Sequence, residues 1–341
     1  CDICMIYGYD NEDENEEYRE HFKELFNLAI PPFYWGALEP EPGKVRFAKD
    51  SEHIFRRPAP DLVLDFCEKN EIDVKGHNLI WQMIYPDWLP DDKEEVKPYI
   101  IKRFREIAER YKDRIKAWDV VNEPLARHHH PEAVLPDDYV YWCFELAEKY
   151  FPHNTLILNE VTSPWYNYNY ENSHYYLLIE NLLLRGARID EIGLQYHLFT
   201  DKEGLRKKRD VILNPEQLFK ILDLYSDFNL PIHISEITVP GFSNDSKDEA
   251  NQQILVENLY KLWFSQAQVK AIVWWNLHDG PAWNDEGELK GGLLREDFSK
   301  KPAYQILDDL INNQWTTEVK LSGSSQYKFK GFYGKYDLNI N

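Results

Sequence analysis

Two observations predict that the chain is an α/β protein, a (β/α)8 TIM barrel with a short C-terminal β-strand extension. Eight short apolar runs recur along the 341 residues, and amphipathic, charge-rich stretches with helical period separate these runs. Strands that are apolar throughout and alternate with helices form a parallel sheet that helices cover. Eight such units fit a closed barrel.

The predicted strands share an apolar composition, and they are residues 1–6, 29–35, 73–80, 117–123, 155–160, 191–198, 231–238 and 271–277. The predicted helices are residues 15–28, 58–70, 92–112, 137–150, 170–185, 215–228 and 248–266. A doubly wound sheet is the structural alternative. The sequence disfavours it, because no Gly-rich phosphate-binding turn follows the first run.

Two units are expected along the chain. Residues 1–312 form the barrel, and residues 313–341 form a β-hairpin with strand-like segments 316–321 and 327–340 around a Ser-Gly-Ser-Ser turn. A lone hairpin is only marginally stable in water. We therefore expect the extension to pack on the barrel or on strands that precede residue 1.

The composition excludes several classes of partner. The formal net charge is -20 and the sequence pI is about 5.0, so the chain repels nucleic acid and anionic lipid. No apolar run reaches the roughly 18 residues of a membrane span. Cys1, Cys4, Cys67 and Cys143 lack the paired spacing of a zinc site, so they are interpreted as buried thiols. No signal sequence is visible at the first residues.

Two glutamates at the ends of apolar runs carry the chemistry. Glu123 ends the run Trp118–Glu123, and Glu236 lies in the run Ile232–Thr238. Active sites of α/β barrels form at the C-terminal ends of the strands, and two carboxylates that face one cleft suffice to break a glycosidic bond. Other polar or aromatic residues at the predicted strand ends are His77, Trp81, Gln82, Asn122, Asn159, Glu160, Gln195, His197, Trp275, His278 and Asp279. Packing alone explains such a set poorly, because buried polar groups cost free energy unless they are partnered.

Five segments carry a resemblance to a known family. They are GHNLIWQ (76–82), WDVVNEP (118–124), IGLQYH (192–197), HISEITV (233–239) and VWWNLHDGPAW (273–283). In this order and spacing they resemble family 10 glycoside hydrolases, the retaining endo-β-1,4-xylanases. The resemblance covers residue 1 to about residue 312. It implies a (β/α)8 barrel that needs no cofactor and no metal.

The resemblance also implies roles for the two glutamates. Glu236 would be the nucleophile, and Glu123 would act first as the acid and then as the base. The two carboxyl groups of such a retaining enzyme stand about 5 to 5.5 Å apart. Glu123 would need a raised pKa, which the charge of Glu236 and partial desolvation would produce.

Substrate-binding residues are likewise implied by the resemblance. Asn122 would bind the 2-hydroxyl of the sugar under attack, and His77 and Gln195 would hold the same sugar. His197 would orient Glu236. The aromatic residues implied in the cleft are Trp275 and Trp283 in its walls and Trp81 beneath it.

Four positions depart from the family pattern. Pro31 and Tyr34 stand where the family has an Asn and a Lys that bind the sugar on the glycone side of the cleaved bond. Tyr34 is expected to supply a hydroxyl or a stacking face instead. Thr238 replaces an Asp that supports His197, and Gln82 replaces a His. These changes leave the bond-breaking residues in place but put the usual xylose contacts in question.

The sequence leaves three alternatives to a xylanase. One is a β-glycosidase of the same fold that acts on decorated xylan or mixed-linkage β-glucan. The others are a non-catalytic glycan-binding barrel and a metal-dependent barrel hydrolase. The run His128–His130 is interpreted as a solvated loop, with substrate contact or metal binding as alternatives. We expect xylan as the partner, a monomer, and a secreted or periplasmic location.

Overall fold

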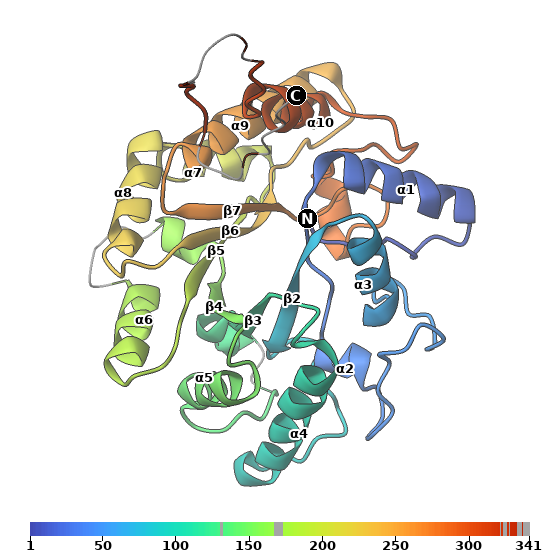
Figure 1. Ribbon diagram of the computed structural model, residues 1–341, viewed down its shortest axis with the longest axis vertical. Helices are drawn as coiled ribbons and strands as arrows, with labels where there is room; N and C mark the ends of the chain where they lie inside the picture. Colours follow the sequence, from blue (N-terminus) through green and yellow to red (C-terminus); the bar gives the residue numbers. More distant parts are fainter. Residues whose placement is uncertain are drawn as a thin grey trace.

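A parallel sheet of seven strands forms the centre of the protein in the computed structural model (Figure 1). The structure describes residues 1–129, 132–166, 173–320, 322, 326, 328–332 and 336, without the side chains of residues 127–129, 284 and 285. The strands pair in chain order, and they are β1 (Leu28–Ala29), β2 (Asp73–Ile80), β3 (Ala117–Asn122), β4 (Thr155–Glu160), β5 (Glu191–His197), β6 (Ile232–Thr238) and β7 (Val269–Trp274).

The first residues of the chain join the two edges of this sheet. The backbone N–H of Asp2 donates to the carbonyl of Trp274 at 3.0 Å, and the N–H of Ile30 donates to the carbonyl of Cys1 at 2.9 Å. Asp2 thus bridges β7 and the segment after β1 and completes the barrel. The predicted (β/α)8 architecture is confirmed, with the eighth stave reduced to a single bridge.

Two predicted strands are shorter than expected. The predicted strand 1–6 pairs only at Asp2; residues 4–7 form turns, in which the N–H of Gly8 donates to the carbonyl of Met5. The predicted strand 29–35 stops after Ala29 apart from isolated bridges. Prolines have no N–H to donate to a sheet, and Pro31 and Pro32 follow after one further residue, Ile30.

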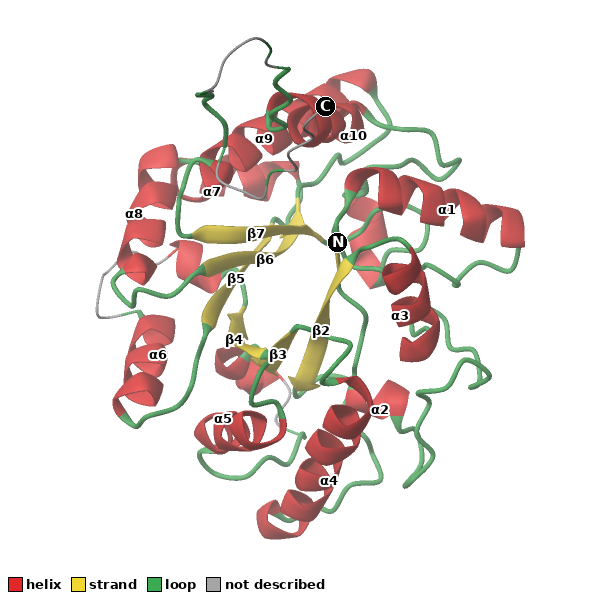
Figure 2. Ribbon diagram, in the orientation of Figure 1, coloured by secondary structure: helices red, strands yellow, loops and turns green. Residues whose placement is uncertain are grey.

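Helices surround the strands on the outside (Figure 2). The α-helices are α1 (Glu12–Leu25), α2 (Trp35–Leu38), α3 (Pro60–Lys69), α4 (Lys93–Tyr111), α5 (Tyr139–Tyr150), α6 (His174–Leu184), α7 (Lys202–Ile212), α8 (Pro215–Ser226), α9 (Ser246–Phe264) and α10 (Pro302–Asp308). The 3-10 helices η1 (Pro124–His129), η2 (Ser163–Tyr166) and η4 (Asn284–Leu289) lie in loops, and the π-helix η5 (Asp309–Gln314) follows α10. Asp92 caps the N-terminus of α4. Its side chain accepts hydrogen bonds from two backbone N–H groups that have no partner within the helix.

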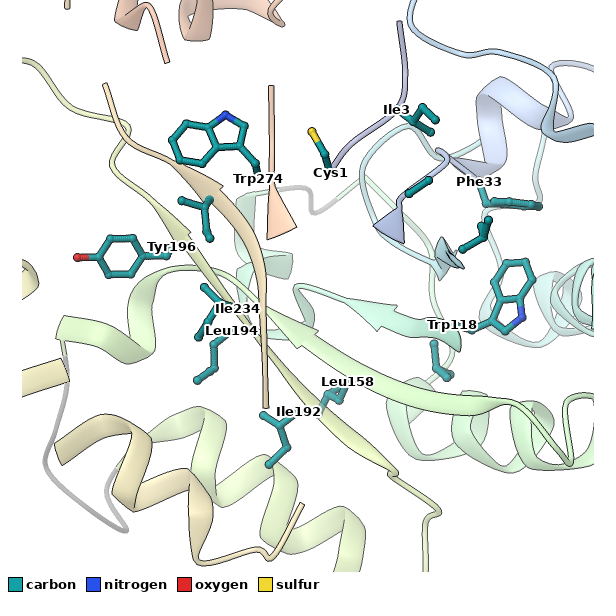
Figure 3. Packing of buried hydrophobic residues seen from close by; sticks show 14 of the residues in the cluster. Cys1, Ile3, Phe33, Trp118, Leu158, Ile192, Leu194, Tyr196, Ile234 and Trp274 are labelled. Atoms are coloured by element: carbon teal, nitrogen blue, oxygen red, sulfur yellow. The ribbon is translucent and has the colours of Figure 1, made fainter. Parts of the chain in front are cut away.

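The hydrophobic core lies between the strands and the helices. Trp118 of β3 is fully buried, with its ring 4.9 Å from that of Phe33 and 5.2 Å from that of Phe151 (Figure 3). Gly76 of β2 makes room for this ring, because a Cβ there would come within 2.2 Å of Trp118. The four cysteines are free and buried, as predicted.

The predicted C-terminal hairpin stays a prediction. Residues 316–320 form no strand, and most of residues 327–340 lie outside the described residues. The ring of Trp315 stacks on that of Phe264 of α9, with 3.8 Å between the ring centres. The ring centre of Phe332 lies 5.4 Å from that of Phe264. These contacts are consistent with an extension that packs on the barrel.

Candidate active site

All ten side chains predicted for the site line one cleft at the C-terminal ends of the strands. The cleft has a volume of about 490 Å³. Its predicted lining residues are Tyr34, His77, Trp81, Asn122, Glu123, Gln195, His197, Glu236, Trp275 and Trp283. The loops add residues that the sequence did not single out, among them Arg56, Arg57, Tyr166, Phe199 and Glu286.

The amide of Gln195 bridges the two glutamates. Its Nε2 donates to Glu123 Oε1 at 2.8 Å and to Glu236 Oε1 at 3.0 Å. The two acceptor oxygens therefore lie no farther apart than these two distances combined. That limit is shorter than the roughly 6.5 Å minimum for inverting glycosidases and fits the roughly 5 to 5.5 Å of retaining ones.

Glu123 sits at a turn directly after β3. Its backbone is left-handed, with φ of 54°, and its N–H donates to the carbonyl of Asn159 at 2.8 Å. Trp81 Nε1 donates to its Oε2 at 3.1 Å. Burial among these groups raises the pKa of Glu123, and the negative charge of Glu236 raises it further. Glu123 is thereby suited to hold a proton.

Glu236 has the opposite electrostatic surroundings. Asn159 Nδ2 donates to its Oε1 at 2.9 Å, and His197 Nε2 lies 3.2 Å from its Oε2. Burial works against ionisation, yet the pKa of Glu236 is lowered because nearby His77 and the contact with His197 favour the carboxylate. Two carboxyl groups with divergent pKa values are the pattern of an acid and a nucleophile.

A buried chain of charges stands behind His77. His77 Nδ1 lies 2.7 Å from Asp119 Oδ2, and Lys75 Nζ approaches the same oxygen at 2.7 Å as an ion pair. Lys75 and Asp119 are fully buried. Burial alone would raise the pKa of Asp119, but Lys75 and His77 lower it to about 2. Lys75 and Asp119 are not visible as site residues in the sequence, because both lie inside strands rather than at strand ends.

His197 is held by Thr238, the residue that replaces the supporting Asp of the family pattern. Its Nδ1 lies 2.9 Å from Thr238 Oγ1, while its Nε2 faces Glu236. Its backbone N–H donates to Thr162 Oγ1 at 2.8 Å. Gln82, another departure from the family pattern, donates from Nε2 to the backbone carbonyl of Glu123 at 3.0 Å.

Asn159 at the end of β4 is a site residue that the sequence analysis did not select. Its Nδ2 donates to Glu236 and also to Asn122 Oδ1, at 2.7 Å. Gly193 on the adjacent strand leaves the space for this side chain, because a Cβ there would come within 2.3 Å of Asn159 Oδ1. Its strand-end position was the available signal. We call Asn122, Glu123, Asn159, Gln195 and Glu236 the cleft floor.

Aromatic rings stand around this floor. The ring of Tyr34 lies 5.7 Å from His77 and 5.2 Å from Trp81. Trp275 packs edge-on against His77 at 5.9 Å and against His197 at 5.7 Å. Trp283 is 45% exposed at the rim. Flat aromatic faces beside a pair of carboxyl groups suit a sugar ring, whose faces are apolar.

The prediction for the histidine run 128–130 stays a prediction. Residue 130 lies outside the described residues, and the side chains of residues 128 and 129 are not described. In the part of the chain that the structure describes, no three His, Cys, Asp or Glu side chains group as metal ligands. No helix among the described residues is long and apolar enough to cross a membrane.

A (β/α)8 barrel with two carboxyl groups this close together and with opposed pKa shifts is typical of glycoside hydrolases. The family model described as glycosyl hydrolase family 10 matches residues 9–310. The chain therefore belongs to glycosyl hydrolase family 10 and is a glycoside hydrolase.

Similar proteins agree with this assignment. Endo-1,4-beta-xylanase A of Caldicellulosiruptor saccharolyticus is 29% identical over 276 residues, which cover 72% of this chain and 77% of that protein. Endo-1,4-beta-xylanase B of Thermotoga neapolitana is 25% identical over 314 residues, covering 88% and 84%. The crystal structure of xylanase 10B from Thermotoga petrophila RKU-1 in complex with xylobiose matches with a TM-score of 0.73 and 23% identity, covering 90% of this chain and 92% of that one. This last likeness bears on the fold alone.

Proposed function

We propose that this glycoside hydrolase is a retaining endo-β-1,4-xylanase in which Glu236 is the nucleophile and Glu123 is the acid and base. The observation that carries the proposal is the single amide nitrogen of Gln195, which contacts both carboxyl groups and keeps their bonded oxygens closer together than an inverting mechanism needs. The xylanases among the similar proteins support xylan as the substrate.

The first step would form a covalent glycosyl-enzyme. A Glu236 oxygen attacks the anomeric carbon, the bond from this carbon to the glycosidic oxygen breaks, and Glu123 gives its proton to the departing oxygen. The pKa of Glu123 is raised by burial and by Glu236, which favours the protonated acid at the start.

The second step would use the change of charge. Once Glu236 is esterified it is neutral, so one of the causes that raise the pKa of Glu123 disappears. Glu123 can then take a proton from water while the water oxygen attacks the anomeric carbon and Glu236 leaves as a carboxylate. Two inversions at the same carbon retain its configuration.

Asn122 supports the sugar contact that this mechanism needs. Its Oδ1 accepts from Asn159, and its buried Nδ2 has no hydrogen-bond partner among the described residues. A buried donor without a partner is costly. A sugar hydroxyl beside the anomeric carbon would satisfy Asn122, and this hydroxyl contact strengthens in the transition state of such enzymes.

The test is the anomeric form of the first product. Proton NMR of xylohexaose during the first turnovers should show new reducing ends in the β configuration and products from internal cleavage. Initial α product would contradict the retaining mechanism. Hydrolysis of mixed-linkage β-glucan without hydrolysis of any xylan would favour the second candidate, a β-glycosidase of altered specificity, which Tyr34 in the cleft wall supports.

We further propose that the enzyme acts as a monomer outside the cytoplasm, because a polysaccharide is too large to cross a membrane. One complete cleft within one chain supports the monomer. Light scattering of the purified protein and fractionation of the source cells test these two points. A stable dimer or a cytoplasmic pool would contradict them.

A further inference from the structure

Arg57 is a cation in the cleft wall, and only part of its N–H donor capacity is engaged among the described residues. The side chain is half-buried and lines the cleft. Its guanidinium lies 4.6 Å from the ring centre of Tyr34 and 5.5 Å from that of Trp283. One of its nitrogens, Nη1, donates to the carbonyl of Arg56 at 2.8 Å. Across the described residues, no carboxylate forms an ion pair with it. We call Tyr34, Arg57 and Trp283 the Tyr34 wall.

The neighbouring Arg56 differs, because its guanidinium already has protein partners. It lies 3.7 Å from the carboxylate of Asp2, and it donates to Asn276 Oδ1 at 3.3 Å and to the carbonyl of Pro281. Glu286, a carboxyl group that also lines the cleft, accepts from Asn276 Nδ2 at 2.7 Å. Arg56 therefore holds loops together, and Arg57 is the cation left for a ligand.

The Tyr34 wall lies close to the cleft floor. Tyr34 touches Arg57 on one side and lies 5.2 Å from Trp81 on the other, and Trp81 donates to Glu123. Two aromatic rings thus separate the guanidinium from the acid and base. A sugar bound over the floor would bring its substituents near Arg57.

We propose that Arg57 binds the carboxylate of a uronic acid branch on the xylan backbone. This inference rests on the proposed xylanase function and names the decoration that the site recognises. A guanidinium presents a planar fork of N–H donors that matches a carboxylate bidentately. The rings of Tyr34 and Trp283 pack against this fork, and the exposed ring of Trp283 offers a face to the branch sugar.

The overall charge of the protein cannot by itself attract a uronate-bearing polymer. The chain carries 59 acidic side chains against 39 lysines and arginines, so its field at a distance repels an acidic polymer. A preference for a uronate-bearing substrate must then come from a local contact. Neutral xylan or arabinoxylan offers no anion for this contact.

The test compares glucuronoxylan with the same polymer after its carboxyl groups are reduced to primary alcohols. We expect kcat/KM to be about tenfold higher on the native polymer, since hydrogen bonds to charged groups contribute this much. Arg57→Gln should bring the ratio of the two kcat/KM values close to one. Losses that affect both polymers equally cancel in this ratio.

The matched control is Arg105→Gln. Arg105 lies on α4, is exposed and does not line the cleft, so this variant removes one positive charge elsewhere and should keep the wild-type ratio. A wild-type ratio near one, or a ratio that Arg57→Gln leaves unchanged, would overturn the inference. Failure of the wild-type protein to hydrolyse either polymer or xylohexaose would instead overturn the proposed function.

Discussion

The cleft floor comes from strand ends, whereas the Tyr34 wall comes largely from loops. On the floor, Gln195 and Glu236 are 2% and 3% exposed and share hydrogen bonds with Glu123 and Asn159. On the wall, Trp283 is 45% exposed, and ring contacts join Arg57 to Tyr34 and Trp283. The floor is therefore suited to a fixed reaction, and the wall to a variable choice of substrate.

The largest expected effect lies on the floor. Glu123→Gln should lower kcat on xylohexaose about 10²–10⁴-fold, the usual contribution of general acid–base catalysis, and Glu236→Gln, which removes the proposed nucleophile, should lower it by no less. Steady-state kinetics measures this loss. An aryl xylobioside with a good leaving group needs little protonation, so Glu123→Gln should lose less glycosylation rate on it than Glu236→Gln does. Equal losses on that substrate would contradict the division of roles.

The buried charges beneath the floor should dominate stability. Asp119→Asn leaves Lys75 buried without its ion-pair partner, which costs about 3–5 kcal/mol of unfolding free energy. Urea denaturation measures this change. Asp137→Asn is the control, because it breaks the exposed pair with Lys93 and should cost less than about 1 kcal/mol. A similar cost for both variants would remove the distinction between the buried chain and the surface.

The lowered pKa of Asp119 should make the unfolding free energy depend on pH. The pKa of Asp119 is lowered to about 2 in the folded protein from an ordinary value of 3.8. Its contribution to the unfolding free energy is therefore complete above the ordinary value and is lost as the pH falls through about 2. In Asp119→Asn, this part of the acid destabilisation should be missing.

The pH profile of kcat/KM should report the opposed shifts on the floor. The proposed mechanism requires ionised Glu236, whose pKa lies below its ordinary value of 4.5, and protonated Glu123, whose pKa lies above the same value. The profile should rise as Glu236 ionises and fall as Glu123 loses its proton, with apparent values that belong to the pair.

A direct titration sharpens this expectation. Glu236→Gln removes a negative charge beside Glu123, so carbon NMR of labelled glutamate should show a lower pKa for Glu123 than in the unaltered protein. The control Glu145→Gln removes an exposed charge on α5 and should leave the pKa of Glu123 unchanged. An unchanged pKa in Glu236→Gln would show that burial alone raises it.

The smallest effect belongs to the wall. Trp283→Ala should raise KM for xylohexaose about two- to tenfold with little change in kcat, because a half-exposed ring adds about 0.5–1.5 kcal/mol of stacking. Trp275→Ala should also lower kcat, since its ring packs on His77 and His197. If Trp283→Ala lowers kcat as much as Trp275→Ala does, the wall is part of the catalytic machinery.

The sequence predicted the floor better than the wall for a physical reason. A carboxylate after an apolar run is visible in one segment, so Glu123 and Glu236 were selected. Arg57 lies in an irregular loop without periodicity, and its contact with Trp283 joins residues more than two hundred positions apart. No local pattern records that contact.

The strand interiors show a second limit. Lys75 and Asp119 read as interruptions of apolar strands, and their pairing depends on the register that places Lys75 opposite Ala117 and His77 opposite Asp119. The two prolines after Ala29 were visible, yet the shortening of that strand was not anticipated. A sequence pattern places residues along a strand, while pairing between strands depends on the whole sheet.

By itself, the sequence determined the alternation of strands and helices, the family, and the two glutamates at strand ends, because these follow from local periodicity and short motifs. Only the tertiary structure decided that one amide joins both carboxyl groups, that Asp2 completes the barrel, and that Arg57 faces the cleft without a carboxylate among the described residues. Each of these depends on distances between segments that only the closed barrel brings together.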